Sequence, residues 1–86
     1  MSYYNDISLD KVIKETERYY DWDINYEMIE SEEIGGGGVI ELYEVDIDGQ
    51  YAERDAIKFF KVREFYSVSV WETDLGFCRL HIEMIA

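Results

Sequence analysis

The sequence lacks positive charge over a long internal segment. No Lys or Arg stands between Tyr19 and Glu53, although this stretch carries eleven acidic residues. They are Asp21, Asp23, Glu27, Glu30, Glu32, Glu33, Glu41, Glu44, Asp46, Asp48 and Glu53. The flanks are nearly balanced, since residues 1–18 hold four acids and three bases and residues 54–86 hold five of each. The net charge of −12 therefore arises almost entirely in one segment.

Cysteine and long apolar runs are also scarce. Cys78 is the only cysteine, so an intrachain disulfide is excluded and a reducing, cytoplasmic setting is favoured. No apolar run approaches the roughly 20 residues that span a bilayer, and residues 1–6 lack the basic and apolar parts of a signal peptide. With 48% hydrophobic and 16% aromatic residues, the 86-residue chain predicts one folded domain over residues 1–86.

The periodicity of apolar residues predicts an α+β fold. Residues 8–20 have a helical repeat preceded by Ser8, a good N-cap. Residues 22–30 and 39–48 alternate with a period of two, which indicates half-buried strands. A second helix is expected over residues 51–62, and its apolar residues are Ala56, Ile57, Phe59, Phe60 and Val62.

A hairpin is predicted at the end of the chain and a loop near its middle. Strands over residues 64–73 and 77–85 would be joined by Asp74-Leu75-Gly76, with Trp71 opposite Arg79. Glu30–Gly38 is expected to be a flexible acidic and glycine-rich hairpin loop, because four consecutive glycines cost too much backbone entropy inside regular structure. The predicted order is α-β-β-α-β-β, a four-stranded antiparallel sheet with two helices on one side.

Several functions are disfavoured by the residues present. Direct binding to nucleic acid or to anionic membrane requires basic patches, which the acidic segment does not supply. The glycine run lacks the Gly-Lys-Ser/Thr of a phosphate loop, and Asp46-Ile47-Asp48-Gly49 lacks the rest of a calcium loop. Cys78 and His81 would face opposite sides of a strand. We therefore expect no enzyme activity, cofactor or metal site.

The acidic residues predict a binding surface for a basic partner. Residues two apart on a strand share a face about 6.6–6.8 Å apart, and neighbouring strands lie about 4.8 Å apart, so two acidic strands form a lattice of carboxylates. Such a lattice can substitute for the phosphates of a nucleic acid in a basic groove. The candidate partner-binding residues are Asp21, Asp23, Glu27, Glu30, Glu32, Glu33, Tyr43, Glu44, Asp46 and Asp48. The alternative is a solvated face that only aids solubility.

Aromatic residues crowd the first half of the chain. Tyr and Trp are enriched at interface hot spots, and Arg stacks on their rings. Trp22 and Tyr26 are expected to fill the core, whereas Tyr3 and Tyr4 precede the first helix and suit an interface better.

In its composition the chain resembles small acidic phage proteins that counter host defence, of the anti-CRISPR and anti-restriction type. The resemblance is carried by the 86-residue length, by the absence of a base from Asp21 to Glu53 and by the lack of a catalytic motif. It implies a protein of the host cytoplasm that blocks the guide-, PAM- or DNA-binding groove of a Cas effector.

Two other functions fit the same sequence. An immunity protein or antitoxin that neutralises a nuclease toxin would need the same acidic surface. A structural or assembly subunit would instead form a homo-oligomer through the mixed sheet face of Phe65, Trp71, Arg79 and His81. The sequence leaves open whether the protein is a monomer or a homodimer.

Overall fold

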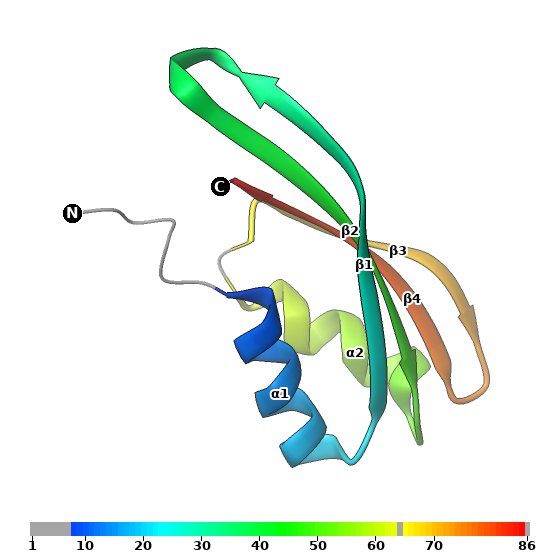
Figure 1. The fold of residues 1–86 in the computed structure, drawn as a ribbon. Helices are drawn as coiled ribbons and strands as arrows, with labels where there is room; N and C mark the ends of the chain where they lie inside the picture. The colour runs from blue at the N-terminus through cyan, green and yellow to red at the C-terminus, as the bar shows by residue number, and fades with distance from the viewer. Residues whose placement is uncertain (1–7, 64, 86) are drawn as a thin grey trace.

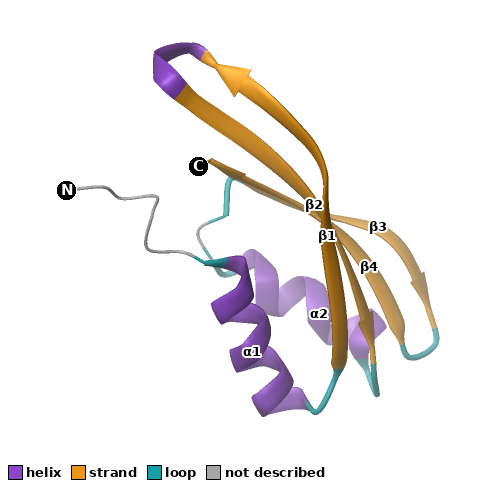
Figure 2. Cartoon of the chain, in the orientation of Figure 1, coloured by secondary structure: helices purple, strands orange, loops and turns teal. Residues whose placement is uncertain are grey.

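Two helices cover one face of a four-stranded antiparallel sheet in the computed structural model, which describes residues 8–63 and 65–85 (Figure 1). The elements are α1 (Leu9–Tyr20), β1 (Asp23–Ile34), the short 3₁₀ turn η1 (Gly35–Gly37), β2 (Gly38–Asp48), α2 (Ala52–Lys61), β3 (Ser67–Asp74) and β4 (Phe77–Ile85). The predicted α+β class and the order α-β-β-α-β-β are confirmed. Figure 2 shows the two helices together on one side of the strands. Neither described helix has the length and apolar character needed to cross a bilayer.

The first helix forms where its cap and its apolar repeat predict it. The Ser8 side-chain oxygen accepts a hydrogen bond from the Lys11 amide at 3.4 Å, which satisfies a free N–H group of the first turn. Asp10 and Lys14 form an exposed ion pair at 3.0 Å, one turn apart. The residues that α1 buries at helical spacing are Leu9, Val12, Ile13 and Thr16.

The second helix is slightly shorter than predicted. Tyr51 has a φ of 66° and belongs to the turn before α2, since this left-handed conformation cannot continue into a helix. Ala56 and Phe60 are buried, as their spacing predicts. The prediction for Val62 was wrong: its side chain is 72% exposed because it follows the last helical turn and leaves the apolar face.

The terminal hairpin has most of the predicted register and one bulge. Val68 pairs with Ile82 and Val70 with Leu80, as expected. The predicted pairing of Trp71 with Arg79 was wrong, because a bulge between Val70 and Glu72 places Glu72 opposite Arg79. The turn is also tighter than predicted, since Asp74 already pairs with Phe77, while Gly76 takes the expected left-handed conformation at φ 73°.

The first hairpin is longer than predicted. Glu30–Ile34 continues β1 instead of forming a loop, and only Gly35–Gly37 makes the connection to β2. Cross-strand pairing resumes after a bulge between Met28 and Glu30 and continues to the glycines. Figure 1 shows this hairpin running well past the helices.

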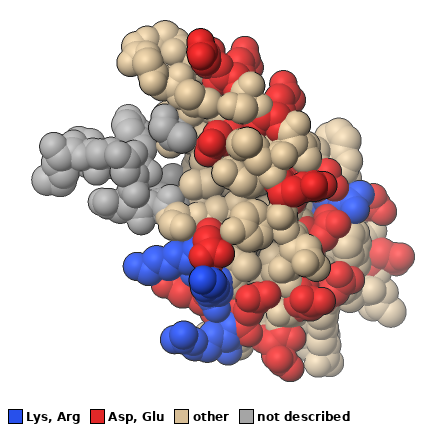
Figure 3. Space-filling model, in the orientation of Figure 1, with Lys and Arg blue, Asp and Glu red and all other residues tan. Residues whose placement is uncertain are grey.

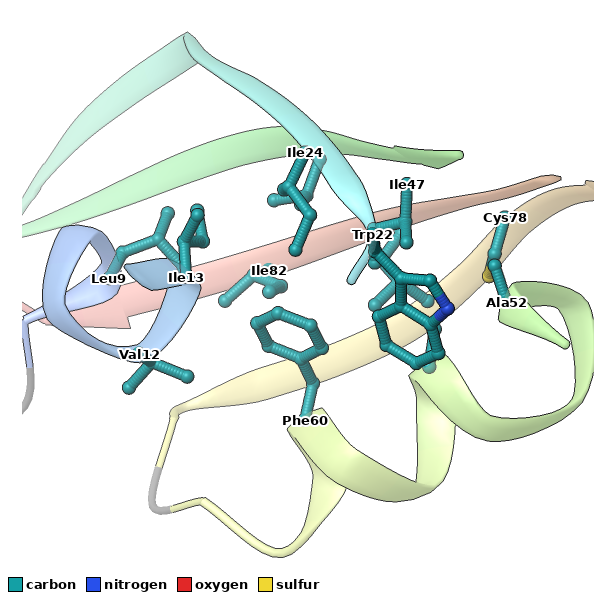
Figure 4. Packing of buried hydrophobic residues seen from close by; sticks show 13 residues of the cluster. Leu9, Val12, Ile13, Trp22, Ile24, Ile47, Ala52, Phe60, Cys78 and Ile82 are labelled. Carbon is teal, nitrogen blue, oxygen red and sulfur yellow. The ribbon is translucent and has the colours of Figure 1, made fainter. Parts of the chain in front are cut away.

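The core lies between the helices and the lower half of the sheet. Phe60 points from α2 towards the strands between Trp22 and Ile82 (Figure 4). Trp22 stacks on Tyr20 with ring centroids 4.1 Å apart, and its Nε1–H donates to the Gln50 carbonyl at 2.9 Å. A Cβ at residue 49 would overlap the Trp22 ring, so glycine is required there. Core filling by Trp22 is confirmed.

Tyr26 was predicted to fill the core, and this prediction was wrong. It is 39% exposed although it lies on the helix side of β1, because it meets α1 only at the exposed residue Asp10. Its hydroxyl donates to the Asp10 carboxylate at 3.2 Å, and burial of the ring together with this carboxylate raises the pKa of Tyr26. Tyr3 and Tyr4, which were predicted to suit an interface, lie outside the described residues.

Candidate functional site

The sheet face turned away from α1 and α2 carries most of the predicted site. Strand order is β1-β2-β4-β3, so β1 and β2 form one side of this outer face. Because side chains alternate along a strand, the residues that pair with one another share a face. We call the acidic part of the β1–β2 outer face the acidic face, and its residues are Asp23, Glu27, Glu30, Glu32, Glu44, Asp46 and Asp48.

Like charges lie directly opposite one another on the acidic face. Asp23 pairs with Asp48, and Glu27 pairs with Glu44. Between these two pairs, Asn25 lies opposite Asp46. Like charges in opposite cross-strand positions destabilise a sheet, so this pattern does not contribute to folding. Folding alone therefore does not explain why carboxylates occupy these positions.

Three predicted site residues lie elsewhere. Asp21 ends α1 in a left-handed conformation, with φ 57°, and its amide donates to the Glu17 carbonyl. Glu33 pairs with Val39 on the helix side of the hairpin. Tyr43 pairs with Ile82 and packs against the core, and burial raises the pKa of its hydroxyl. The structure therefore does not bring these three side chains together with the acidic face.

Arg79 on β4 is the base that sequence reasoning did not place beside the acids. Its guanidinium donates two hydrogen bonds to the Asp46 carboxylate, at 2.7 and 3.0 Å. It also forms ion pairs with Glu44 at 2.8 Å and with Glu72 at 3.6 Å. The hydrogen bonds from Arg79 lower the pKa of Asp46 and, in turn, the pKa of Arg79 is raised. One cation is shared among three carboxylates, so the cluster remains negative.

An aromatic pair borders this cluster. The rings of Trp71 and His81 stack with centroids 4.4 Å apart and planes 6° apart. His81 Nε2 lies 3.7 Å from a Glu44 oxygen, and it is buried without a hydrogen-bond partner among the described residues. Trp71 is 65% exposed and so presents its other ring face to solvent. Strand alternation had predicted Trp71 on this outer face with Arg79 and His81, and the stacking on His81 confirms that side. The bulge changes only the cross-strand partner, because it places Glu72 opposite Arg79.

The acidic face is shallow and polar. An open hollow on it is lined by Asn25, Tyr26, Glu27, Glu44 and Asp46. This arrangement offers hydrogen-bond acceptors to Lys and Arg side chains from several directions. Within residues 8–63 and 65–85, no cluster of three or more His, Cys, Asp or Glu side chains is placed to hold a metal ion.

Cys78 and His81 lie on opposite faces of β4, as predicted. Cys78 is buried on the helix side, where burial raises the pKa of its thiol to about 11. The thiol is therefore protonated at neutral pH and is a poor nucleophile.

Positive charge is concentrated away from the acidic face. Lys11, Lys14 and Arg18 line a hollow along α1. Figure 3 shows basic side chains gathered over α1, whereas acidic side chains follow the β1–β2 hairpin. The bases of α1 thus lie apart from the acidic face, although acids stand among them and Arg79 lies within the acidic face itself. Comparison of the chain with protein-family models, with curated proteins and with solved structures finds no match.

Proposed function

We propose that the protein is a non-enzymatic inhibitor whose acidic face occupies the basic nucleic-acid-binding groove of a partner protein. The observation that supports this most directly is the pairing of Asp23 with Asp48 and of Glu27 with Glu44 on a sheet face that neither described helix covers. These pairs repel one another in the free protein. Lys and Arg side chains of a partner would relieve that repulsion, so the electrostatic energy favours the complex over the free state.

The spacing of the carboxylates suits such mimicry. Along β2, Glu44, Asp46 and Asp48 repeat about every 6.6–6.8 Å. Across the strands, Asp23 and Glu27 on β1 lie about 4.8 Å from Asp48 and Glu44, with Asn25 between them. Duplex DNA carries about one charge per 1.7 Å of its axis, spread over two strands. A groove that binds phosphates with several Lys and Arg residues can therefore contact several carboxylates of the acidic face at once. Arg79 leaves the face negative, because it shares its charge among Glu44, Asp46 and Glu72.

Among inhibitors of this kind, an anti-CRISPR-type phage protein that blocks a Cas effector in the host cytoplasm agrees best with the small size and the base-free segment. A nuclease toxin also has a basic groove, so an immunity protein or antitoxin is the alternative with the same electrostatics. The identity of the inhibited partner distinguishes these two functions.

The test reverses charge on β1, where no described base contacts the acids. We predict that the double variant Asp23→Lys and Glu27→Lys weakens inhibition of DNA binding by the partner on the order of tenfold or more. The same variant should fold at least as stably as the wild type, since each new Lys faces Asp48 or Glu44 and gains about 0.2–1 kcal/mol. Inhibition is measured by competition with labelled DNA across a panel of Cas effectors, restriction enzymes and nuclease toxins.

A matched control variant makes the same change of net charge elsewhere. Glu15→Lys with Glu33→Lys reverses two acids, one exposed on α1 and one on the helix side of the hairpin. This variant should inhibit nearly as well as the wild type. Equal loss of inhibition in both variants would show an effect of net charge alone, and unchanged inhibition in the β1 variant would remove the acidic face from the mechanism.

A further inference from the structure

The two edges of the sheet differ in charge. Strand order β1-β2-β4-β3 makes β1 and β3 the edge strands, and among the described residues each pairs with one neighbour only. An edge strand presents unpaired N–H and C=O groups on every second residue, which can template pairing with another strand. Proteins usually prevent this with charged residues, prolines or bulges along the edge. β1 follows this rule, since its outward-facing residues include Asp23, Glu27 and Glu30.

β3 lacks such protection over most of its length. Its first five residues, Ser67-Val68-Ser69-Val70-Trp71, contain no charge and no proline, and the bulge comes only after Val70. The acids Glu72 and Asp74 follow at the turn end of the strand. Exposed apolar side chains lie along the same edge, with Val70 45% exposed and Trp71 65% exposed. In a chain of net charge −12, this uncharged edge is suited to strand pairing.

We propose that β3 is a dimer edge, at which β3 of a second copy of this chain pairs antiparallel around a two-fold axis. A register centred on Ser69 places Val68 beside Val70 of the second copy and Ser69 beside Ser69 of the second copy. Residues opposite one another then face the same side, so the helices of both copies cover one face of an eight-stranded sheet. This use of the edge is independent of the proposed inhibition.

The distribution of charge decides which of the two edges a second copy can use. Two molecules of charge −12 repel each other, and pairing at β1 would bring acidic strands into contact. Pairing at β3 instead leaves β1 and β2 at the two far ends of the combined sheet, separated by both copies of β4 and β3. Pairing at β3 therefore keeps the acidic strands of the two copies apart, whereas pairing at β1 would bring them together. The valine side chains near Ser69 contribute apolar burial on the helix side.

The test compares the same substitution on the two edges. Ser69→Glu places two carboxylates opposite one another at the centre of the proposed interface, whereas Ser31→Glu adds the same charge to exposed β1. Sedimentation equilibrium in 0.5 M NaCl should show a dimer for the wild type and for Ser31→Glu. For Ser69→Glu, we predict a dissociation constant raised by about tenfold or more.

Three outcomes overturn the proposal: a wild type that stays monomeric up to its solubility limit, a Ser69→Glu variant that dimerises like the wild type, or equal weakening by both variants. Hydrogen exchange on the wild type provides a test that needs no variant. Amides of Ser67–Val70 should exchange more slowly as protein concentration rises, while those of Asp23–Tyr26 on the other edge should not change. Equal exchange at all concentrations in Ser67–Val70 also overturns it.

Discussion

At the scale of single residues, the contact between Asp46 and Arg79 sets how Asp46 responds to pH. The Arg79 hydrogen bonds lower the pKa of Asp46 in the folded state. A carboxyl group with a lowered folded-state pKa stabilises the fold above its unfolded pKa, which is about 3.9. That contribution is lost as the pH falls through the folded-state pKa. Arg79 thus holds Asp46 ionised under conditions in which free carboxyl groups begin to take up protons.

We predict that Asp46→Asn lowers the free energy of unfolding at pH 7 and that its difference from the wild type shrinks as the pH falls below about 4. Urea denaturation between pH 7 and pH 2.5 measures this difference. Glu27→Gln is the control, since Glu27 faces Glu44 and no described base contacts it. Removing Glu27 should not lower stability at pH 7. A pH-independent difference for Asp46→Asn would mean that the ion pair with Arg79 does not stabilise the fold.

The residue scale also shows which site features the sequence could supply. Strand alternation predicted Asp23, Glu27 and Glu44 on one face of the hairpin. Alternation can be recognised from a short stretch of sequence, so this part of the site was predictable. Arg79 could not be placed beside them, since the sequence does not reveal that β2 pairs with β4. Trp71 was given the wrong partner because a bulge adds a residue that no local pattern marks.

At the scale of elements, the first hairpin has two parts with different packing. In the near part, Ile24, Val45 and Ile47 are buried beneath the helices. In the far part, the side chains of Glu30–Glu33 are exposed on both faces of the strand. The helices and the terminal hairpin were predicted nearly in full, because caps, turn glycines and apolar repeats are local signals. The far part of the first hairpin was mistaken for a loop, because the loop expected from the four glycines was extended back to Glu30, whereas only Gly35–Gly37 make the connection.

We predict a gradient of local stability along this hairpin. Amide hydrogens of Ser31–Glu33 should exchange at least about tenfold faster than those of Tyr26 and Val45, because few buried apolar contacts hold the far part closed. Native-state hydrogen exchange at pH 7 measures the gradient within the pairs of β1 and β2. Uniform protection from Asp23 to Ile34 would show that the hairpin opens as one unit.

At the scale of the whole molecule, one charge sign dominates a small fold. The net charge of −12 destabilises the compact state by repulsion. The overall class and element order were predictable, because they follow from the sequence of helical and alternating segments. The strand order was not, since it depends on pairing between residues far apart in the chain.

We predict that raising NaCl from 0.05 to 0.5 M increases the urea midpoint, because salt screens the repulsion between exposed carboxylates. Binding to a basic partner should weaken over the same range. The Asp23→Lys and Glu27→Lys variant is less negative by four charges and should gain less from salt. A midpoint that falls with salt in the wild type would indicate that ion pairs such as Arg79 with Asp46 outweigh the repulsion.

The buried thiol of Cys78 has a further consequence. It is the chain's only cysteine, it lies on a central strand, and its pKa of about 11 keeps it protonated. A thiol reagent can reach it only when β4 separates from the helices. The rate at which Cys78 is labelled then measures how often the native protein opens locally, and no cysteine has to be introduced for this measurement.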